Sequence, residues 1–144
     1  MNVFFVSGAP KSGTTWLQRL LDAHPQVSCA GEGHFIDRFV GPMAKLASAY
    51  NESLGLEAQQ VYEGRPYYGA VGQAEFDAVA RVFIEQRLRS RGAGPEVLWF
   101  GDKTPGYAKN LPDLVRIFPE ARFINIVRDP RDVTVSHLAH SRRA

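Results

Sequence analysis

The stretch VFFVSGAPKSGTTW, residues 3–16, decides the fold. It begins with Val3–Val6, four apolar residues of the β-branched and aromatic kinds that buried strands favour, and continues into Gly8–Gly13, whose glycines and proline predict a tight loop. Apolar residues then recur at helical spacing until a proline interrupts the pattern: Trp16, Leu17, Leu20 and Leu21. We predict a strand, a loop and a helix in this order, with the hydroxyls of Thr14 and Thr15 capping the helix.

The same alternation of short apolar runs and longer amphipathic segments continues along the chain. Further strands are predicted at 27–30, 97–100 and 123–127, and further helices at 42–50, 73–91, 106–118 and from 131 onward. Strands that alternate with helices of this length form βαβ units, which place the strands in a parallel sheet. The predicted fold is therefore α/β, a P-loop-like parallel β-sheet flanked by helices on both faces in three layers (α/β/α). Residues 1–144 are expected to form a single domain.

The composition is that of an ordinary folded protein and argues against several classes of function. Of the 144 residues, 44% are apolar and 22% are charged, and the formal net charge is +2. This small charge gives no reason to expect a nucleic-acid partner, and the apolar runs are too short to cross a membrane. The single cysteine, Cys29, excludes an internal disulfide and a multi-cysteine zinc site. We expect a cytoplasmic protein with no metal ion and no membrane partner.

The loop over residues 8–15 has the chemistry of an anion-binding cradle. Its glycines allow close approach of the backbone, and the N-terminus of the following helix presents unpaired N–H groups. The nucleotide P-loop carries a lysine directly after its last glycine, whereas here Thr14 follows Gly13 and the lysine is Lys11. Magnesium-dependent ATP or GTP chemistry, as in a P-loop kinase, is therefore less favoured than another use of the same cradle.

Two segments together resemble the sulfotransferases that use 3′-phosphoadenosine 5′-phosphosulfate (PAPS). Residues 10–16 (PKSGTTW) resemble their 5′-phosphosulfate loop, and Arg128 after a strand, with Ser136 eight positions later, resembles their 3′-phosphate site. Further similarity to the branch with the tyrosylprotein and many bacterial sulfotransferases lies in residues 21–25, 31–32 and 118–123. Members of the family are longer, so the chain resembles a member that is truncated at its C-terminus.

The resemblance implies that PAPS, the sulfuryl donor, is held from two sides. Lys11 is expected to neutralise charge on the bridging oxygen as the sulfuryl group leaves. Arg128 and Ser136 are expected to hold the 3′-phosphate, although Arg128 would also suit an ion pair with Asp129 or Asp132. The 5′-phosphate is expected against four residues that would also make a helix cap: Ser12, Gly13, Thr14 and Thr15.

The resemblance also implies the catalytic groups. Glu32 is expected to be the general base that takes the acceptor's proton, with a pKa raised by partly closed apolar surroundings, and His34 is the alternative base. Lys103 is expected to steady the transferring sulfuryl group. Trp16 is expected either in the core or near the adenine ring. Tyr107 is expected at the surface, with a place at the border of the site as the alternative.

The predicted function is transfer of the sulfuryl group from PAPS to a hydroxyl or amine acceptor, without a metal. A non-catalytic PAPS-binding fragment or pseudoenzyme is the alternative, because the family's later glycine-containing loop has no counterpart before residue 144. A P-loop kinase is a third, less favoured alternative. For the same reason we expect the chain to be at best a weak catalyst, and to expose apolar surface that favours self-association.

Overall fold

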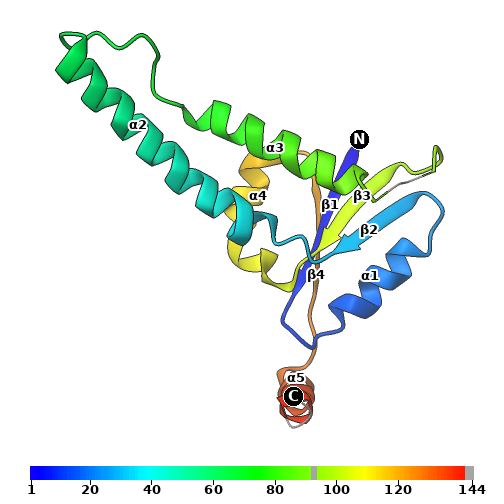
Figure 1. Cartoon of the computed structure of the whole chain (residues 1–144). Helices are drawn as coiled ribbons and strands as arrows, with labels where there is room; N and C mark the ends of the chain where they lie inside the picture. The colour runs from blue at the N-terminus through cyan, green and yellow to red at the C-terminus, as the bar shows by residue number, and fades with distance from the viewer. Residues whose placement is uncertain (92–93, 142–144) are drawn as a thin grey trace.

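The computed structural model describes residues 1–91 and 94–141. Strands and helices alternate along the chain, with one π-helical turn (η1) and one 3₁₀ segment (η2) (Figure 1). In chain order the elements are β1 (Asn2–Gly8), α1 (Thr14–Asp22), β2 (Val27–Gly31), η1 (Phe35–Val40), α2 (Gly41–Val61), α3 (Gln73–Arg89), β3 (Trp99–Lys103), η2 (Pro105–Asn110), α4 (Leu111–Ile117), β4 (Arg122–Ile126) and α5 (Pro130–Ser141).

The four strands form one parallel sheet in the order β2-β3-β1-β4. β1 has β3 on one side and β4 on the other. Because all the pairings are parallel, the carboxyl ends of the four strands meet at one edge. The register places Val6 opposite both Lys103 and Ile124, and Gly31 opposite Lys103. The loop after β1 and the segment after β4 leave from this carboxyl edge, at the lower end of the sheet in Figure 1. The predicted parallel sheet is confirmed.

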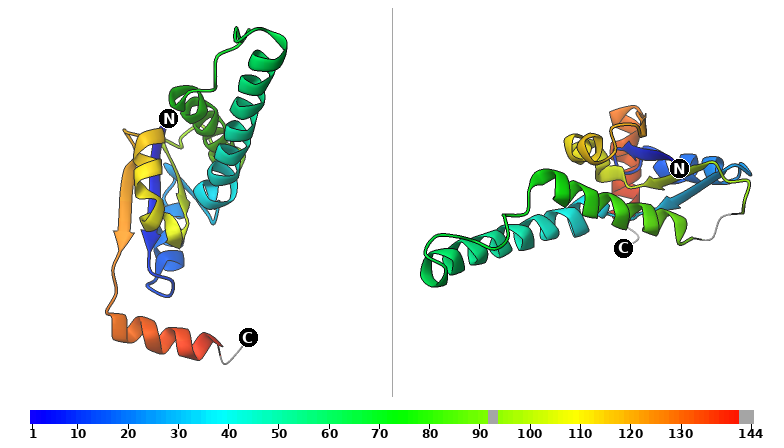
Figure 2. Two further views of the ribbon diagram at one scale, coloured as in Figure 1. Left: turned by 90° about the vertical axis from the view of Figure 1, so that its left-hand side faces the viewer. Right: turned by 90° about the horizontal axis from the view of Figure 1, so that it is seen from above.

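Helices cover both faces of the sheet, which confirms the predicted three layers (Figure 2). Val3 and Phe5 of β1 point into a large core that includes side chains of η1, α3 and α4. The alternate residues Phe4 and Val6 point to the other face, where Leu17 and Leu21 of α1 pack against them. A strand buried on both faces carries apolar residues at successive positions, which explains the uninterrupted run at residues 3–6.

Several predicted boundaries differ from the structure. The strand predicted at 97–100 begins two residues later and runs on to Lys103, because Asp102 and Lys103 are buried with polar partners and do not have the apolar character of a strand. The helix predicted at 106–118 is divided into η2 and α4, with a proline in the first turn of α4. Proline has no N–H to continue a preceding helix and is tolerated in a first turn. The helix predicted at 42–50 is longer and extends to Val61.

Two elements extend away from the sheet. The far half of α2 and the chain that leads from it into α3 project as an arm, and α5 lies beyond the carboxyl edge (Figure 2). Val127, just before α5, and Val135 within it are 84% and 67% exposed. No helix in the described ranges combines the length and the apolar character that a membrane span needs.

Candidate active site

Residues from all four strand ends surround a cavity of about 570 Å³ at the carboxyl edge of the sheet. The loop after β1 contributes Lys11, the segment after β2 contributes Glu32 and His34, and the residue Arg128 follows β4. The remaining lining residues are Pro10, Gly13, Thr14, Thr15, Pro105 and Gly106. The topology thus brings together residues that are more than one hundred positions apart in the sequence, as parallel sheets commonly do at their binding sites.

The loop between β1 and α1 has a shape that only glycine permits at two positions. A Cβ on Gly8 would lie 2.6 Å from the Ile126 side chain and 2.9 Å from the Ser12 hydroxyl, and Gly13 has φ 100°. Gly13 is also the N-cap of α1, and no side chain caps the helix. The prediction that Thr14 and Thr15 cap the helix is therefore wrong.

The loop leaves polar groups available for an anion. Ser12 is almost fully buried, and its hydroxyl has no hydrogen-bond partner among the described residues. The first N–H groups of a helix also have no partner within the helix. A buried hydroxyl without a partner costs free energy, which a bound anion would recover. These observations fit the predicted phosphate cradle at residues 8–15.

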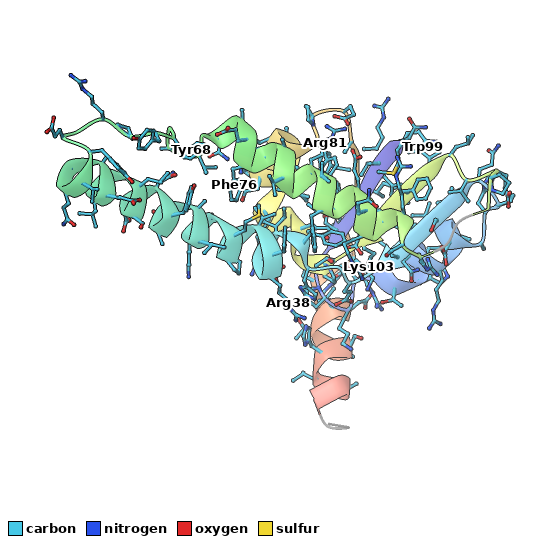
Figure 3. The ribbon with its side chains drawn as sticks, turned by 45° about the horizontal axis from the view of Figure 1, so that its top comes forward. Arg38, Tyr68, Phe76, Arg81, Trp99 and Lys103 are labelled. Atoms are coloured by element: carbon cyan, nitrogen blue, oxygen red, sulfur yellow. The ribbon has the colours of Figure 1, made fainter. Side chains whose placement is uncertain are left out.

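Lys103 and Glu32 form an ion pair next to Thr15, at the end of this loop. The Lys103 ammonium, almost fully buried, donates to Glu32 Oε1 at 2.5 Å and to the Thr15 hydroxyl at 3.3 Å. Figure 3 shows Lys103 at the carboxyl end of β3, away from Trp99 at the start of that strand. Thr15 therefore joins the helix that follows the loop to the catalytic candidates.

The ion pair changes the protonation of Glu32. The hydrogen bond from Lys103 holds the pKa of the Glu32 carboxyl below its ordinary value, and burial opposes this only in part. The expectation of a raised pKa is therefore wrong, because the carboxyl faces a cation rather than apolar walls. Glu32 is a carboxylate at neutral pH and can accept a proton without first losing one.

His34 lies beside Glu32 and contacts two carboxylates. Its Nε2 is 3.5 Å from Glu32 Oε2, and its Nδ1 is 3.0 Å from Asp37 Oδ2. Oε2 is the Glu32 oxygen that Lys103 does not hold. His34 therefore stays within reach of the same proton, and the choice between the two bases stays a prediction.

A buried group that the sequence analysis missed lies behind the ion pair. The Asp102 carboxylate, 1% exposed, accepts hydrogen bonds from the hydroxyls of Tyr107 and Thr104 and from the backbone N–H of Gly33. Burial raises the pKa of Asp102 and of Tyr107. Tyr107 is itself 1% exposed, so the expectation of a surface position is wrong. The part of this cluster that the sequence shows is the polar run Asp102–Thr104, close behind the strand predicted at 97–100.

Of the two residues predicted to hold the 3′-phosphate, Arg128 lies at the cavity and Ser136 does not. Arg128 lines the cavity, donates from Nη1 to the backbone oxygen of Lys11 at 3.2 Å, and lies 3.7 Å from Asp132. Ser136 is half-buried on α5 and does not line the cavity. Trp16 is 66% exposed, which rules out the core position and leaves the adenine contact as a prediction.

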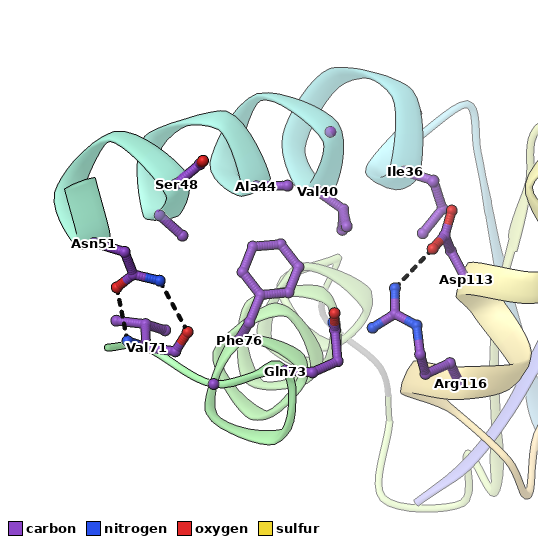
Figure 4. A pocket seen from close by; sticks show the side chains of 13 residues that line it. Ile36, Val40, Ala44, Ser48, Asn51, Val71, Gln73, Phe76, Asp113 and Arg116 are labelled. Atoms are coloured by element: carbon purple, nitrogen blue, oxygen red, sulfur yellow. Dashed lines mark hydrogen bonds and ion pairs between the residues drawn. The ribbon is translucent and has the colours of Figure 1, made fainter. Parts of the chain in front are cut away.

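A second cavity, of about 370 Å³, lies between α2, α3 and α4 (Figure 4). Its polar groups are already paired: Asn51 exchanges hydrogen bonds with the backbone of Val71, and Arg116 pairs with Asp77 and Asp113. Its floor is apolar. This cavity lacks the anion loop, the lysines and the carboxylate that the carboxyl edge brings together. In the described part of the chain, no group of three His, Cys, Asp or Glu side chains could hold a metal ion.

Comparison with known proteins identifies the family. The model of the sulfotransferase family matches residues 4–144. The chain belongs to this family. Among its relatives, a protein-tyrosine sulfotransferase 1 of Danio rerio is 30% identical over 131 residues, which are 91% of this chain and 34% of the relative. A protein-tyrosine sulfotransferase 2 of Gallus gallus is 33% identical over 131 residues, 91% of this chain and 32% of the relative. The chain thus spans about a third of the length of these relatives.

The lowered pKa of Glu32 predicts a pH-dependent contribution to stability. A carboxyl whose folded pKa is lowered stabilises the fold above the ordinary glutamate pKa of about 4.3, and this contribution is lost as the pH falls through the folded value. We expect Lys103→Met to lower the free energy of unfolding, relative to wild type, more at pH 7 than near pH 3. Because Glu32 is half exposed, the change should be below about 1 kcal/mol. Urea denaturation at both pH values measures it, and an identical difference at the two would contradict the ion pair.

Proposed function

We propose that this chain binds PAPS and takes part in transfer of its sulfuryl group to a hydroxyl or amine acceptor. The observation that carries the proposal is the Glu32–Lys103 ion pair. It lies beside the anion loop, because Glu32 lines one cavity with the loop residues and another with Lys103. Membership of the sulfotransferase family gives the class of reaction. A carboxylate, two lysines and an anion loop are the groups that such a transfer needs.

Residues of this chain fit the two phosphates of the donor. The unpartnered Ser12 hydroxyl and the start of α1 would hold the 5′-phosphate. The Arg128 guanidinium, whose planar fork suits phosphate, would hold the 3′-phosphate, with Ser136 as its predicted partner. Bound PAPS would supply the reactive sulfuryl group. The Asp132 contact of Arg128, at 3.7 Å, is long enough to be exchanged for a phosphate.

The protein's own groups then perform three tasks. Glu32 receives the acceptor's proton at Oε2, the oxygen not held by Lys103. Lys103, which is buried and therefore weakly screened, places a fixed positive charge beside the site of transfer. Lys11 adds a second cation from the loop at the other side of the cavity and neutralises charge on the leaving group.

The relatives favour a particular acceptor to try first. Both relatives described above are named protein-tyrosine sulfotransferases. A phenol hydroxyl loses its proton more easily than an alcohol, which suits a carboxylate base whose pKa is lowered. We therefore propose a tyrosine hydroxyl as the first acceptor to test, within the broader class of hydroxyl and amine acceptors.

Nucleotide binding should depend on the 3′-phosphate. We expect 3′-phosphoadenosine 5′-phosphate to bind more tightly than adenosine 5′-phosphate, because a charge-assisted contact with Arg128 contributes about 1.5–3 kcal/mol. Arg128→Ala should remove the preference, and Arg122→Ala, at the far end of β4, should keep it. Calorimetry measures the affinities, with ATP and magnesium as the comparator that a kinase would prefer. Equal affinity of wild type for the two adenosine nucleotides would reject the 3′-phosphate site.

Turnover should depend on Glu32 while nucleotide affinity does not. Glu32→Gln keeps the shape of the side chain but cannot accept a proton, and loss of a general base typically lowers the rate by about 10²–10⁴-fold. Transfer from PAPS to a tyrosine peptide measures the effect in a preparation that shows wild-type activity, and the matched variant Glu120→Gln, on the surface, should retain activity. Wild-type turnover in Glu32→Gln would move the base to His34. A wild type that binds the nucleotide without any transfer would favour the non-catalytic alternative.

We also propose that the chain self-associates. The exposed Val127 directly follows β4, an edge strand with unpaired backbone groups, and the exposed Val135 lies on α5 beyond it. Sedimentation velocity over a range of concentrations should show a mass above that of one chain, and Val135→Lys should reduce it. A single monomeric species at all concentrations would reject this proposal.

A further inference from the structure

The Asp102 carboxylate has no part in the proposed chemistry and yet is among the most buried side chains of the protein. It occupies the next-to-last position of β3, beside Lys103. Successive side chains of a strand point to opposite faces of the sheet, so Asp102 and Lys103 contact different surroundings. Burial of a carboxylate is costly unless hydrogen bonds satisfy it, and here Tyr107, Thr104 and Gly33 each donate a hydrogen bond to it.

The contacts of Asp102 converge on the segment that carries Glu32. The backbone N–H of Gly33 donates to both Asp102 oxygens, at 3.0 and 3.1 Å. The Thr104 hydroxyl donates to Asp102 at 2.8 Å and accepts the N–H of His34 at 3.3 Å. Two successive backbone N–H groups directly after Glu32 are therefore held by one buried cluster.

A further donor holds the cluster against the core. The Tyr107 hydroxyl donates to Asp102 Oδ2 at 2.7 Å, and the Tyr107 ring packs edge-on against Phe5 of β1. Since all the partners of Asp102 donate, the ionised carboxylate can accept every one of these hydrogen bonds. Gly33 also packs closely on its neighbours, because a Cβ there would lie 2.5 Å from the Phe35 ring.

We propose that Asp102 is a positioning residue, which holds the backbone after Glu32 so that the Glu32 carboxylate meets the ammonium of Lys103 in the geometry that sulfuryl transfer requires. The functional part rests on the proposed function. Two residues of β3 therefore bind the segment that carries Glu32. Asp102 accepts a hydrogen bond from the backbone of Gly33, and Lys103 donates one to the Glu32 side chain. The half-exposed Glu32 would otherwise be free to turn into solvent.

The titration midpoint of the Glu32 carboxyl shows whether Asp102 holds the Glu32 segment in place. The groups that face Glu32 are Lys103 and His34, and Lys11 and Arg128 line the same cavity. The groups near Asp102 are the donors named above, Lys103 and the buried Cys29. Release of the Glu32 segment lengthens the distance between Glu32 and its cations, whereas loss of the Asp102 charge alone would lower the Glu32 midpoint, so a rise reports the release. A carboxylate that moves away from a cation titrates at higher pH, by about 1 unit or more.

The test is a ¹³C NMR titration of the Glu32 side-chain carboxyl in the whole chain, with its signal assigned by its loss in Glu32→Gln. In wild type the midpoint should lie below that of an ordinary glutamate. Asp102→Ala should raise it by about 1 pH unit, toward the midpoint in Lys103→Met. Asp102→Asn keeps one acceptor oxygen and should give a smaller rise. The control is Asp113→Ala, which removes a carboxylate that pairs with Arg116 on α4 and does not line the cavity of Glu32; it should leave the midpoint unchanged.

Folding of the variants is checked by the amide spectrum. If Asp102→Ala does not fold, Thr104→Val decides, because it removes the hydroxyl between Asp102 and the N–H of His34 while it keeps the side chain's shape. A raised Glu32 midpoint in folded Thr104→Val supports the proposal. An unchanged midpoint in the folded variants, together with a raised one in Lys103→Met, would overturn it. Calorimetry with 3′-phosphoadenosine 5′-phosphate on wild type tests the donor assignment separately from the role of Asp102. Absence of binding would reject the donor assignment. A raised Glu32 midpoint in the variants would still establish that Asp102 positions Glu32.

Discussion

The arrangement of the candidate active site depends on the ion pair between Glu32 and Lys103. It joins the ends of two neighbouring parallel strands, since Gly31 of β2 lies opposite Lys103 of β3. Lys103 is almost fully buried, and a buried ammonium without an acidic partner would be strongly destabilising. An acidic group at this position therefore stabilises the buried lysine. The same ion pair keeps Glu32 ionised and directed to the cavity.

The pair also connects the sheet to the anion loop. Lys103 reaches the Thr15 hydroxyl in the first turn of α1, and Arg128 beyond β4 reaches the backbone of Lys11. The loop is thus tied to strands on both sides of β1. Close packing of Gly8 against Ile126 adds a steric limit to its shape. A loop held in this way needs little rearrangement when an anion binds, and preorganised charge of this kind is what lowers barriers for reactions that develop negative charge.

The sequence was sufficient to predict the parallel sheet and most residues of the cavity. Apolar runs and glycine-rich turns are local signals, and β1 and the loop after it follow directly from them. The cluster of Asp102, Thr104 and Tyr107 could not be predicted in this way, because its stability comes from partners that are distant in sequence. The direction of the Glu32 pKa was wrong for the same reason, since it depends on a cation 71 positions away. The position of α5 was also beyond prediction, because its apolar residues give no strong preference for one face.

The most direct test of the account is a crystal structure of the chain with 3′-phosphoadenosine 5′-phosphate. The account predicts the 5′-phosphate against the loop at residues 8–15, within hydrogen-bond distance of Ser12, and the 3′-phosphate on Arg128. Lys103 and Glu32 should remain paired and should face the 5′-phosphate, where a sulfuryl group would be attached. A nucleotide bound between α2 and α3, or one whose 5′-phosphate lies away from the loop, would contradict the account.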